Sequence, residues 1–313
     1  MNHLNQLATK ILAFISLIIL LDFTAGYLFR YLETKALNNN PQGMIAEFTM
    51  WRAEGDIMIF GASEAHGGLI PSLMKNKLGI SVFNCSNDAK PFYYQYCMIN
   101  TVIERKKPKV IIWSIYSCDL NTPTKRDMNS LSVLNPFYDT NDYCKKVINK
   151  KSKYENLKMV SNLYRYNSRI LNLISNIFSK TETDRGYVAL SNSGYKYPTL
   201  KSGSEDCGID SEIVDSFIEI IKKCKATDVE LILIIIPKFE NINNSENFGY
   251  KNLIEICGKY DVPLIKEFYN SPIFLNDSTL FRDNDHLNDK GARLFTALLC
   301  DKIKQIRETK CIH

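Results

Sequence analysis

The stretch GDIMIFGAS, residues 55–63, opens the part of the chain that decides the fold. It is a short, continuous apolar run that ends in small residues, which is typical of a strand buried on both faces. Four further runs of this kind follow: SVFNCS (81–86), KVIIWSIYS (109–117), VELILIIIPK (229–238) and VPLIKEF (262–268). Each run is too short to be a separate buried helix. We therefore predict a strand in each of them.

Amphipathic stretches with helical spacing lie beside these runs. They are FYYQYCMINTVIERKK (92–107), SEIVDSFIEIIKKCKA (211–226), NLIEICGKY (252–260) and DKGARLFTALLCDKIKQIR (289–307). Continuous apolar strands that alternate with helices indicate a parallel sheet covered on both faces. The sequence therefore predicts an α/β fold.

The N-terminus contains a candidate membrane span, ILAFISLIILLDFTAGYLF at residues 11–29. A helix needs about 20 mostly apolar residues to cross a bilayer. No convincing cleavage site follows, so we predict an uncleaved single-pass anchor over residues 1–30. The charges on either side of the span, Lys10 before it and Arg30 and Lys35 after it, differ little. We expect the domain that follows to be extracytoplasmic.

One acidic residue, Asp22, interrupts the apolar span. A charge deep in a bilayer is costly and usually pairs with another helix or lies near the interface. Asp22 therefore either contacts a membrane protein partner or marks the point where the span enters the headgroups.

The rest of the chain is predicted to form one domain. Residues 31–54 look like a linker, and residues 55–310 carry the α/β pattern. Residues 119–205 break the alternation, contain one helical stretch at 158–180, and are predicted to be a largely helical insertion. Insertions after the carboxyl ends of strands commonly add substrate-binding surface.

Composition excludes several classes of protein. The net charge is +5, and the Lys-rich run KKVINKKSK (145–153) suits anionic lipid headgroups, an acidic glycan or a plain solvated face. No recognisable nucleic-acid module is present, so we predict no nucleic-acid partner. The nine cysteines include no CxxC pair and no metal-ligand spacing, so we predict no metal and no cofactor. Their odd number argues against an oxidising compartment.

The chain has four histidines, which limits the choice of a catalytic base. His3 precedes the membrane span and His313 is the last residue, which leaves His66 and His286. His286 stands directly before the last predicted helix, where the chain can approach the carboxyl edge of the sheet. It is therefore the preferred base.

Ser63 is the candidate nucleophile, because it stands where the first core strand stops. A serine hydroxyl becomes a good nucleophile only when a base takes its proton. Asp283, three residues before His286, can fold back on the imidazole and fix its tautomer. Two alternatives remain: Ser63 as a helix N-cap, and Asp285 in place of Asp283.

Two blocks of sequence carry a resemblance to a known family. IFGASEAH (59–66) and DNDHLNDKGA (283–292) look like the first and last blocks of the SGNH/GDSL hydrolase superfamily. The resemblance implies a three-layer α/β/α flavodoxin-like sheet. It also implies Ser63 as nucleophile, His286 as general base and Asp283 as the acid that orients the base.

The oxyanion donors of that superfamily have no clear counterpart here. The superfamily usually supplies them from a glycine after the second strand and an asparagine after the third. At those places the chain reads NCSNDAK and YSCDLN, so the candidates are Ser86, Asn87, Asp119 and Asn121. Without one such donor, the reaction barrier rises by roughly 3–4 kcal/mol.

Two more residues have open interpretations. His66, three residues after Ser63, is either a residue that lines the pocket or a surface or capping histidine. Lys238, after a strand end, either binds an anionic substrate or is solvated in a loop.

An N-terminal anchor, a large insertion and a GAS first block make the chain similar to membrane-tethered SGNH proteins. These proteins add or remove acetyl groups on envelope or extracellular polysaccharides. The resemblance therefore implies a serine ester hydrolase or O-acyltransferase that acts on an acylated glycan through an acyl-serine. The alternatives are a catalytically weak scaffold that assists envelope glycan assembly and a lipid esterase.

Overall fold

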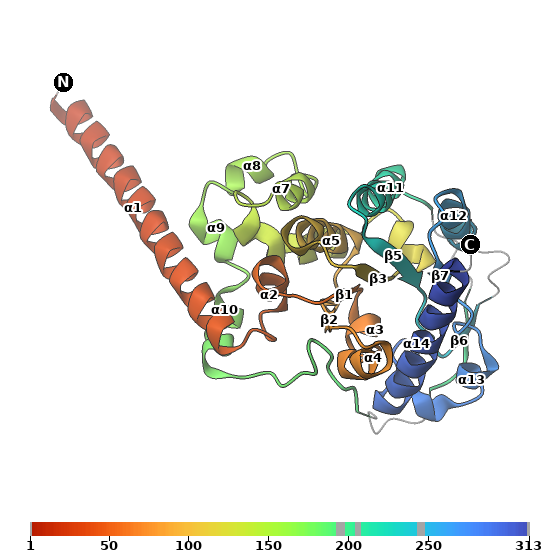
Figure 1. Cartoon of the computed structure of the whole chain (residues 1–313). Helices are drawn as coiled ribbons and strands as arrows, with labels where there is room; N and C mark the ends of the chain where they lie inside the picture. The colour runs from red at the N-terminus through yellow and green to blue at the C-terminus, as the bar shows by residue number, and fades with distance from the viewer. Residues whose placement is uncertain (1, 192–197, 204–207, 243–247, 312–313) are drawn as a thin grey trace. The chain divides into compact units, whose positions relative to one another are not determined.

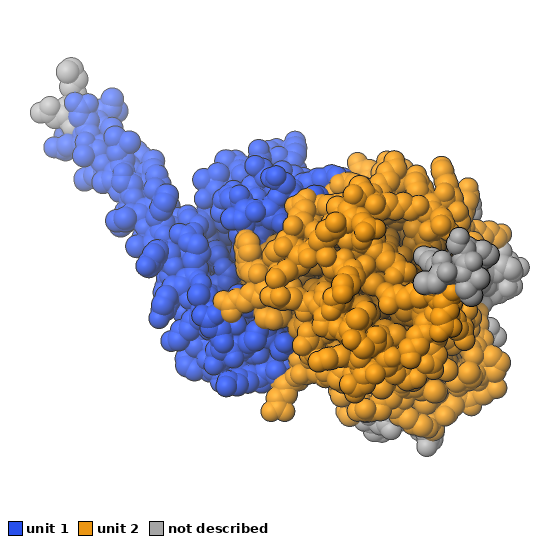
Figure 2. Space-filling view, viewed as in Figure 1, with its two compact units in different colours: residues 1–44, 131–181 blue, residues 45–130, 182–313 orange. Residues whose placement is uncertain are grey.

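The computed structural model describes residues 2–191, 198–203, 208–242 and 248–311. The chain forms two compact units, which Figure 2 colours separately. Unit 1 comprises residues 1–44 and 131–181, and unit 2 comprises residues 45–130 and 182–313. The sequence prediction had placed its boundaries at residues 30, 54, 119 and 205 instead.

A parallel sheet forms the centre of unit 2 (Figure 1). Within the described residues it has five strands in the order β2-β1-β3-β5-β7. Their bounds are β1 Ile57–Phe60, β2 Val82–Asn84, β3 Val110–Ser114, β5 Glu230–Ile234 and β7 Leu264–Ile265. All neighbours pair in parallel, and the order is the flavodoxin-like one. The predicted α/β fold is confirmed, with strands shorter than the apolar runs.

Helices cover both faces of the sheet (Figure 1). On one face, α5 (Phe92–Lys106) packs against α11 (Ser211–Ala226). On the other, α4 (Pro71–Leu78) packs against α14 (Asp289–Cys311). Of these helices, α5, α11 and α14 match predicted amphipathic stretches, whereas α4 was not predicted; together they complete the three-layer arrangement.

Successive side chains of each strand point to opposite faces of the sheet, so each strand packs against both helical layers. Trp113 of β3 is buried between the two helices of one face, with ring centroids 5.5 Å from Phe92 and 5.5 Å from Phe217. Ile59 of β1 points to the opposite layer and shares a buried cluster with Phe295 of α14. Burial on both faces explains why the strands read as continuous apolar runs.

Shorter elements complete unit 2. They are α2 Ile45–Trp51, α3 Ser63–His66, the 3₁₀ helix η1 Ser117–Leu120, α6 Lys125–Ser130, α12 Phe248–Lys259, α13 Pro272–Leu275, η3 Ser278–Leu280 and a parallel pair of strands, β4 Lys201–Gly203 and β6 Glu240–Ile242.

Unit 1 is helical. It contains α1 Asn2–Asn39, η2 Leu131–Phe137, α7 Asp142–Ile148, α8 Glu155–Lys158, α9 Asn162–Tyr166 and α10 Ile170–Phe178. The helix α1 is long and apolar enough to cross a membrane by its length and composition. It continues through Asn39, and α2 follows, so the predicted linker at 31–54 is mostly helical.

The C-terminal half of α1 packs against α9 and α10. The ring of Phe29 lies 5.3 Å from that of Tyr166, and the Asn40 amide donates to Asn176 Oδ1 at 2.7 Å. The predicted single helix at 158–180 was wrong, because the chain breaks between Tyr166 and Ile170. The break allows both short helices to turn a buried side onto α1.

Candidate active site

Ser63 is the first residue of α3, directly after the turn that ends β1. A Cβ at Gly61 would lie 2.5 Å from the Ala65 Cβ and 3.0 Å from the Ser114 Cβ, so this turn requires glycine. Ala62, not Ser63, holds the N-cap position of α3. The Ser63 hydroxyl is therefore not used as a helix cap.

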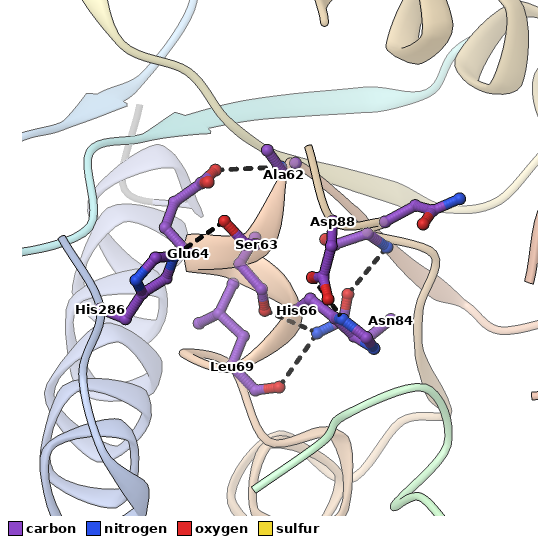
Figure 3. A network of polar contacts seen from close by, with 12 residues as sticks. Ala62, Ser63, Glu64, His66, Leu69, Asn84, Asp88 and His286 are labelled. Atoms are coloured by element: carbon purple, nitrogen blue, oxygen red, sulfur yellow. Dashed lines mark hydrogen bonds and ion pairs between the residues drawn. The ribbon is translucent and has the colours of Figure 1, made fainter. Parts of the chain in front are cut away.

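Three of the residues predicted from sequence meet at this turn. Ser63 Oγ lies 2.8 Å from Nε2 of His286, a residue 223 positions later in the chain. The other ring nitrogen, Nδ1, lies 2.8 Å from Asp283 Oδ1. Figure 3 shows the His286 ring pointing at Ser63 from the side opposite His66 and Asp88. The geometry is that of a nucleophile, a base and a group that orients the base.

The carboxylate of Asp283 decides which ring nitrogen of His286 carries hydrogen. Burial acts to raise the pKa of Asp283, but hydrogen bonds from the His286 ring and from the N–H groups of Asp285 and His286 outweigh it. The pKa therefore lies below its usual value, and the group is an ionised acceptor near neutral pH. Nδ1–H must donate to it, which leaves Nε2 to accept from the Ser63 hydroxyl.

The loop that carries His286 is held by a buried amide that the sequence reasoning missed. Asn288 donates to the carbonyls of Thr279 and Phe281 at 2.8 and 3.1 Å and accepts from the Gly291 N–H at 3.0 Å. It is 3% exposed. Because these bonds close the loop before α14, the imidazole is presented at a fixed position.

A second histidine–aspartate pair faces the same space. His66 Nδ1 lies 2.7 Å from Asp88 Oδ1, and this hydrogen bond is the main reason that the Asp88 pKa lies below its usual value. A hollow of about 280 Å³, called here the Ser63 hollow, is lined by Ser63, His66, Asp88, Leu190, Arg282 and His286, among others. His66 therefore lines this hollow. No group of three or more His, Cys, Asp or Glu side chains in the described ranges is arranged to hold a metal ion.

The predicted oxyanion donors after β2 are engaged elsewhere. The Ser86 N–H donates to Asn84 Oδ1 at 3.0 Å, and Ser86 is fully buried. The Asn87 N–H donates to the Gly61 carbonyl at 3.2 Å, and its side-chain amide donates to the Tyr94 hydroxyl at 3.0 Å. Neither lines the Ser63 hollow.

The predicted donors after β3 do not line the Ser63 hollow. Asp119 accepts from the Tyr116 N–H at 2.7 Å, and Asn121 forms an isolated bridge with Ile209. Both line a separate hollow of about 310 Å³. Asp119 also lines a small hollow with Gly61, Ala62 and Glu64 beside the Ser63 turn, whereas Asn121 does not.

A charged cluster stands beside the site. Burial, together with the nearby Glu64 carboxylate, raises the pKa of Asp119 to about 7. Lys238 lies over the Tyr116 ring, 4.2 Å from its centroid, and 3.5 Å from Asp285 Oδ1. Its side chain is only 20% exposed, so the prediction of a solvated loop residue was wrong. Asp285 turns to this lysine, whereas the His286 ring is paired with the other aspartate of the loop.

Two further residues that support the turn were missed. The Asn84 amide donates to the carbonyls of Ala65 and Leu69 at 2.8 and 3.2 Å, which ties the end of β2 to the Ser63 turn (Figure 3). Glu64 Oε1 accepts from the Ala62 N–H at 3.0 Å and from the Ser114 hydroxyl at 3.1 Å. The available signal was an asparagine at the end of an apolar strand, because a buried amide needs partners.

Comparisons with known proteins give a match among solved structures alone. No protein-family model and no curated protein matches the chain. Among solved structures, the chain is similar to the psychrotrophic esterase EstA from Pseudoalteromonas sp., in a structure inhibited by monoethylphosphonate. The match has a TM-score of 0.42 and 10% sequence identity, and it covers 81% of this chain and 99% of the esterase. A likeness of this size does not bear on activity.

Proposed function

We propose that the chain is a serine-dependent ester hydrolase or O-acyltransferase that works through an acyl-serine. The observation that carries the proposal is the pair of 2.8 Å hydrogen bonds that links Ser63 through His286 to Asp283. A hydroxyl, an imidazole and an ionised carboxylate in this order form the arrangement that activates serine in unrelated folds.

The first half of the reaction forms the acyl-serine. His286 Nε2 takes the Ser63 proton while Oγ forms a bond to the carbonyl carbon of the ester, and the carbonyl oxygen becomes an oxyanion. The imidazolium is stabilised by Asp283, 2.8 Å from Nδ1. When the oxyanion collapses, the ester C–O bond breaks, and Nε2 returns the proton to the leaving alcohol.

The second half repeats these steps with a different acceptor. Nε2 takes a proton from water or from a sugar hydroxyl, whose oxygen attacks the acyl carbon; when the bond from that carbon to Ser63 Oγ breaks, Nε2 returns the proton to Oγ. Water gives hydrolysis, and a sugar hydroxyl gives O-acylation.

Oxyanion stabilisation is the weakest part of the site. As the first residue of α3, Ser63 has an N–H without an acceptor inside its own helix, and we assign it to the oxyanion. The N–H groups of Ser86 and Asn87 already have protein acceptors. With each missing donor worth about 3–4 kcal/mol, turnover is expected to be slow.

The acyl group in this proposal is acetyl or another short chain. The Ser63 hollow, at about 280 Å³, is slightly smaller than most pockets for drug-sized ligands. Together with the sequence resemblance, this favours acetylated polysaccharide of the envelope or the extracellular matrix over long-chain lipid esters. We further propose that α1 anchors the chain in a membrane with unit 2 outside the cytoplasm.

A second candidate is a catalytically weak protein that assists envelope glycan assembly. The commitment of the Ser86 and Asn87 N–H groups to other acceptors favours it. The two candidates differ in whether the serine is activated.

Labelling of the full chain in detergent with a fluorescent fluorophosphonate tests this difference. Wild type should label, and both Ser63→Ala and His286→Ala should lose the label. Ser86→Ala is the matched control: it removes a buried hydroxyl near the turn but keeps the backbone N–H, and should label like wild type. Folded wild type that does not label would favour the second candidate. Transfer of acetyl from p-nitrophenyl acetate to a sugar, compared with its hydrolysis, separates transferase from esterase.

A further inference from the structure

Exposed apolar side chains gather on the part of unit 1 that runs from α8 into the start of α9. Leu157, Val160 and Leu163 are 69%, 72% and 45% exposed. Large apolar side chains that cluster in solvent mark a surface with a partner. Residues 153–163 are called here the α8–α9 surface.

This surface is bonded to α1 at Asp22. The Asp22 carboxylate accepts hydrogen bonds from Ser161 Oγ at 2.7 Å, the Asn162 N–H at 2.9 Å and the Leu163 N–H at 3.0 Å. One turn further on, a Cβ at Gly26 would lie 2.4 Å from the Asn162 side chain, so the two elements touch closely. The α8–α9 surface therefore lies beside Asp22.

Asp22 is also where the free part of α1 ends. The residues from His3 to Leu21 are exposed, those from Ile11 to Leu21 are apolar apart from Ser16, and α1 projects from the rest of unit 1 over this part (Figure 1). Unlike the span predicted at 11–29, residues 4–21 end at Asp22; they would span about 27 Å at 1.5 Å per residue, close to the roughly 30 Å of a bilayer core, and Lys10 within them can extend its amine towards the headgroups. If these residues fill the core, Asp22 and the α8–α9 surface lie in the headgroup layer.

The charges of the segment suit that layer. The run at 145–153 holds five lysines, and Lys153 lies over the exposed ring of Tyr154, 4.9 Å from its centroid. Exposed apolar side chains that follow a lysine-rich run and a tyrosine in the sequence are typical of segments that lie in the membrane interface. The acid within residues 145–163, Glu155, is buried and paired with Lys158 at 2.8 Å.

We propose that the α8–α9 surface is a second membrane contact that binds the headgroup layer of an anionic bilayer, with Leu157, Val160 and Leu163 inserted and the lysines on lipid phosphates. The bilayer would then hold unit 1 at two points, the α1 span and this surface. The proposal does not depend on the activity of Ser63.

Tryptophan variants of the full chain, reconstituted in vesicles, test the depth of the surface. Leu157→Trp and Val160→Trp should each lose about half of the added emission when the lipids are brominated near the headgroup, since interfacial elements lie about 5–10 Å deep. Phe178→Trp is the matched control. Phe178 is 84% exposed in the same unit, but it lies on α10, whose end is bonded to Asn39, seventeen residues beyond Asp22 along α1.

Phe178→Trp should therefore keep its emission in the same lipids. Absence of quenching at both 157 and 160, or equal quenching at 178, would overturn the proposal and leave the surface to a protein partner. Circular dichroism checks that each variant is folded. Quenching should also be about twofold stronger in phosphatidylglycerol than in phosphatidylcholine at low salt, and raised salt should reduce it. Equal quenching in the two lipids would overturn the assignment of the lysines to lipid phosphates.

Discussion

Replacement of Asp283 by asparagine separates the charge of this residue from its geometry. All three hydrogen bonds to Asp283, from the His286 ring and from the N–H groups of Asp285 and His286, end on the same oxygen, Oδ1. The amide oxygen of an asparagine can take that position and accept the same three bonds. The imidazole should keep its orientation and tautomer, and only the negative charge is lost.

The size of the effect follows from the distance and the exposure. The carboxylate lies 2.8 Å from the ring nitrogen and is 48% exposed, so an effective dielectric constant of about 40–80 applies. At that distance, a charge stabilises the imidazolium by about 1.5–3 kcal/mol. Asp283→Asn should therefore lower kcat/KM about 10- to 150-fold. Asp283→Ala removes the acceptor as well and should cost about 10³–10⁴.

The assay is hydrolysis of p-nitrophenyl acetate by the full chain in detergent. Asp285→Asn is the control, because this residue is on the same loop but pairs with Lys238, and it should stay within about twofold of wild type. A loss of 10⁴ in Asp283→Asn would contradict the view that all three bonds survive on one oxygen. No loss at all would mean that Asp283 does not assist His286.

Two further predictions concern stability and local order. Because Asp119 has a pKa of about 7 in the folded chain and 3.8 ordinarily, the folded state binds its proton more tightly, and wild type loses stability as pH rises between these values. The Asp119→Asn variant has no such group to titrate and keeps its stability over this range. The melting temperature of the variant minus that of wild type should therefore be larger at about pH 8 than at about pH 5. The same difference at both pH values would refute the raised pKa of Asp119. Asp22→Ala removes a charged acceptor from the Asn162 and Leu163 N–H groups, and at about 1.5–3 kcal/mol their hydrogen exchange in nanodiscs should quicken about 10- to 100-fold. The Leu173 N–H, bonded to the Arg169 carbonyl, should exchange as before, and an equal change in rate at all three amides, or no change at Asn162 and Leu163, would refute the role of Asp22.

The sheet could be predicted from sequence because burial on both faces leaves a visible mark. Each strand is a continuous apolar run; Ser63 stands at the end of one such run, and His286 directly before the last predicted helix. The helical character of residues 119–205 was also predicted, but the unit that they form with α1 was not. Its packing joins residues more than 130 positions apart, as Asn40 with Asn176, and an amphipathic stretch does not show which distant segment it packs against.

The supports of the site were hidden for a similar reason. Asn288 and Asn84 act through backbone carbonyls of other segments, and a sequence does not display which carbonyls are near. The N–H groups of Ser86 and Asn87 were plausible donors by position alone. Their acceptors, Asn84 Oδ1 and the Gly61 carbonyl, become visible only in three dimensions.

Unit 1 is built from two separate stretches of the chain, residues 1–44 and 131–181, and this has a consequence during synthesis. The first part of this unit, α1, leaves the ribosome long before its packing partners, because Asp22 and Ser161 are 139 residues apart. At about 5–20 residues per second, the gap lasts roughly 7–28 s. During that time, the apolar part of α1 can engage the membrane insertion machinery while the Asp22 carboxylate still lacks its α9 donors. In the proposed anchor, α1 would thus enter the membrane first, and residues 131–181 would fold onto a helix already in place.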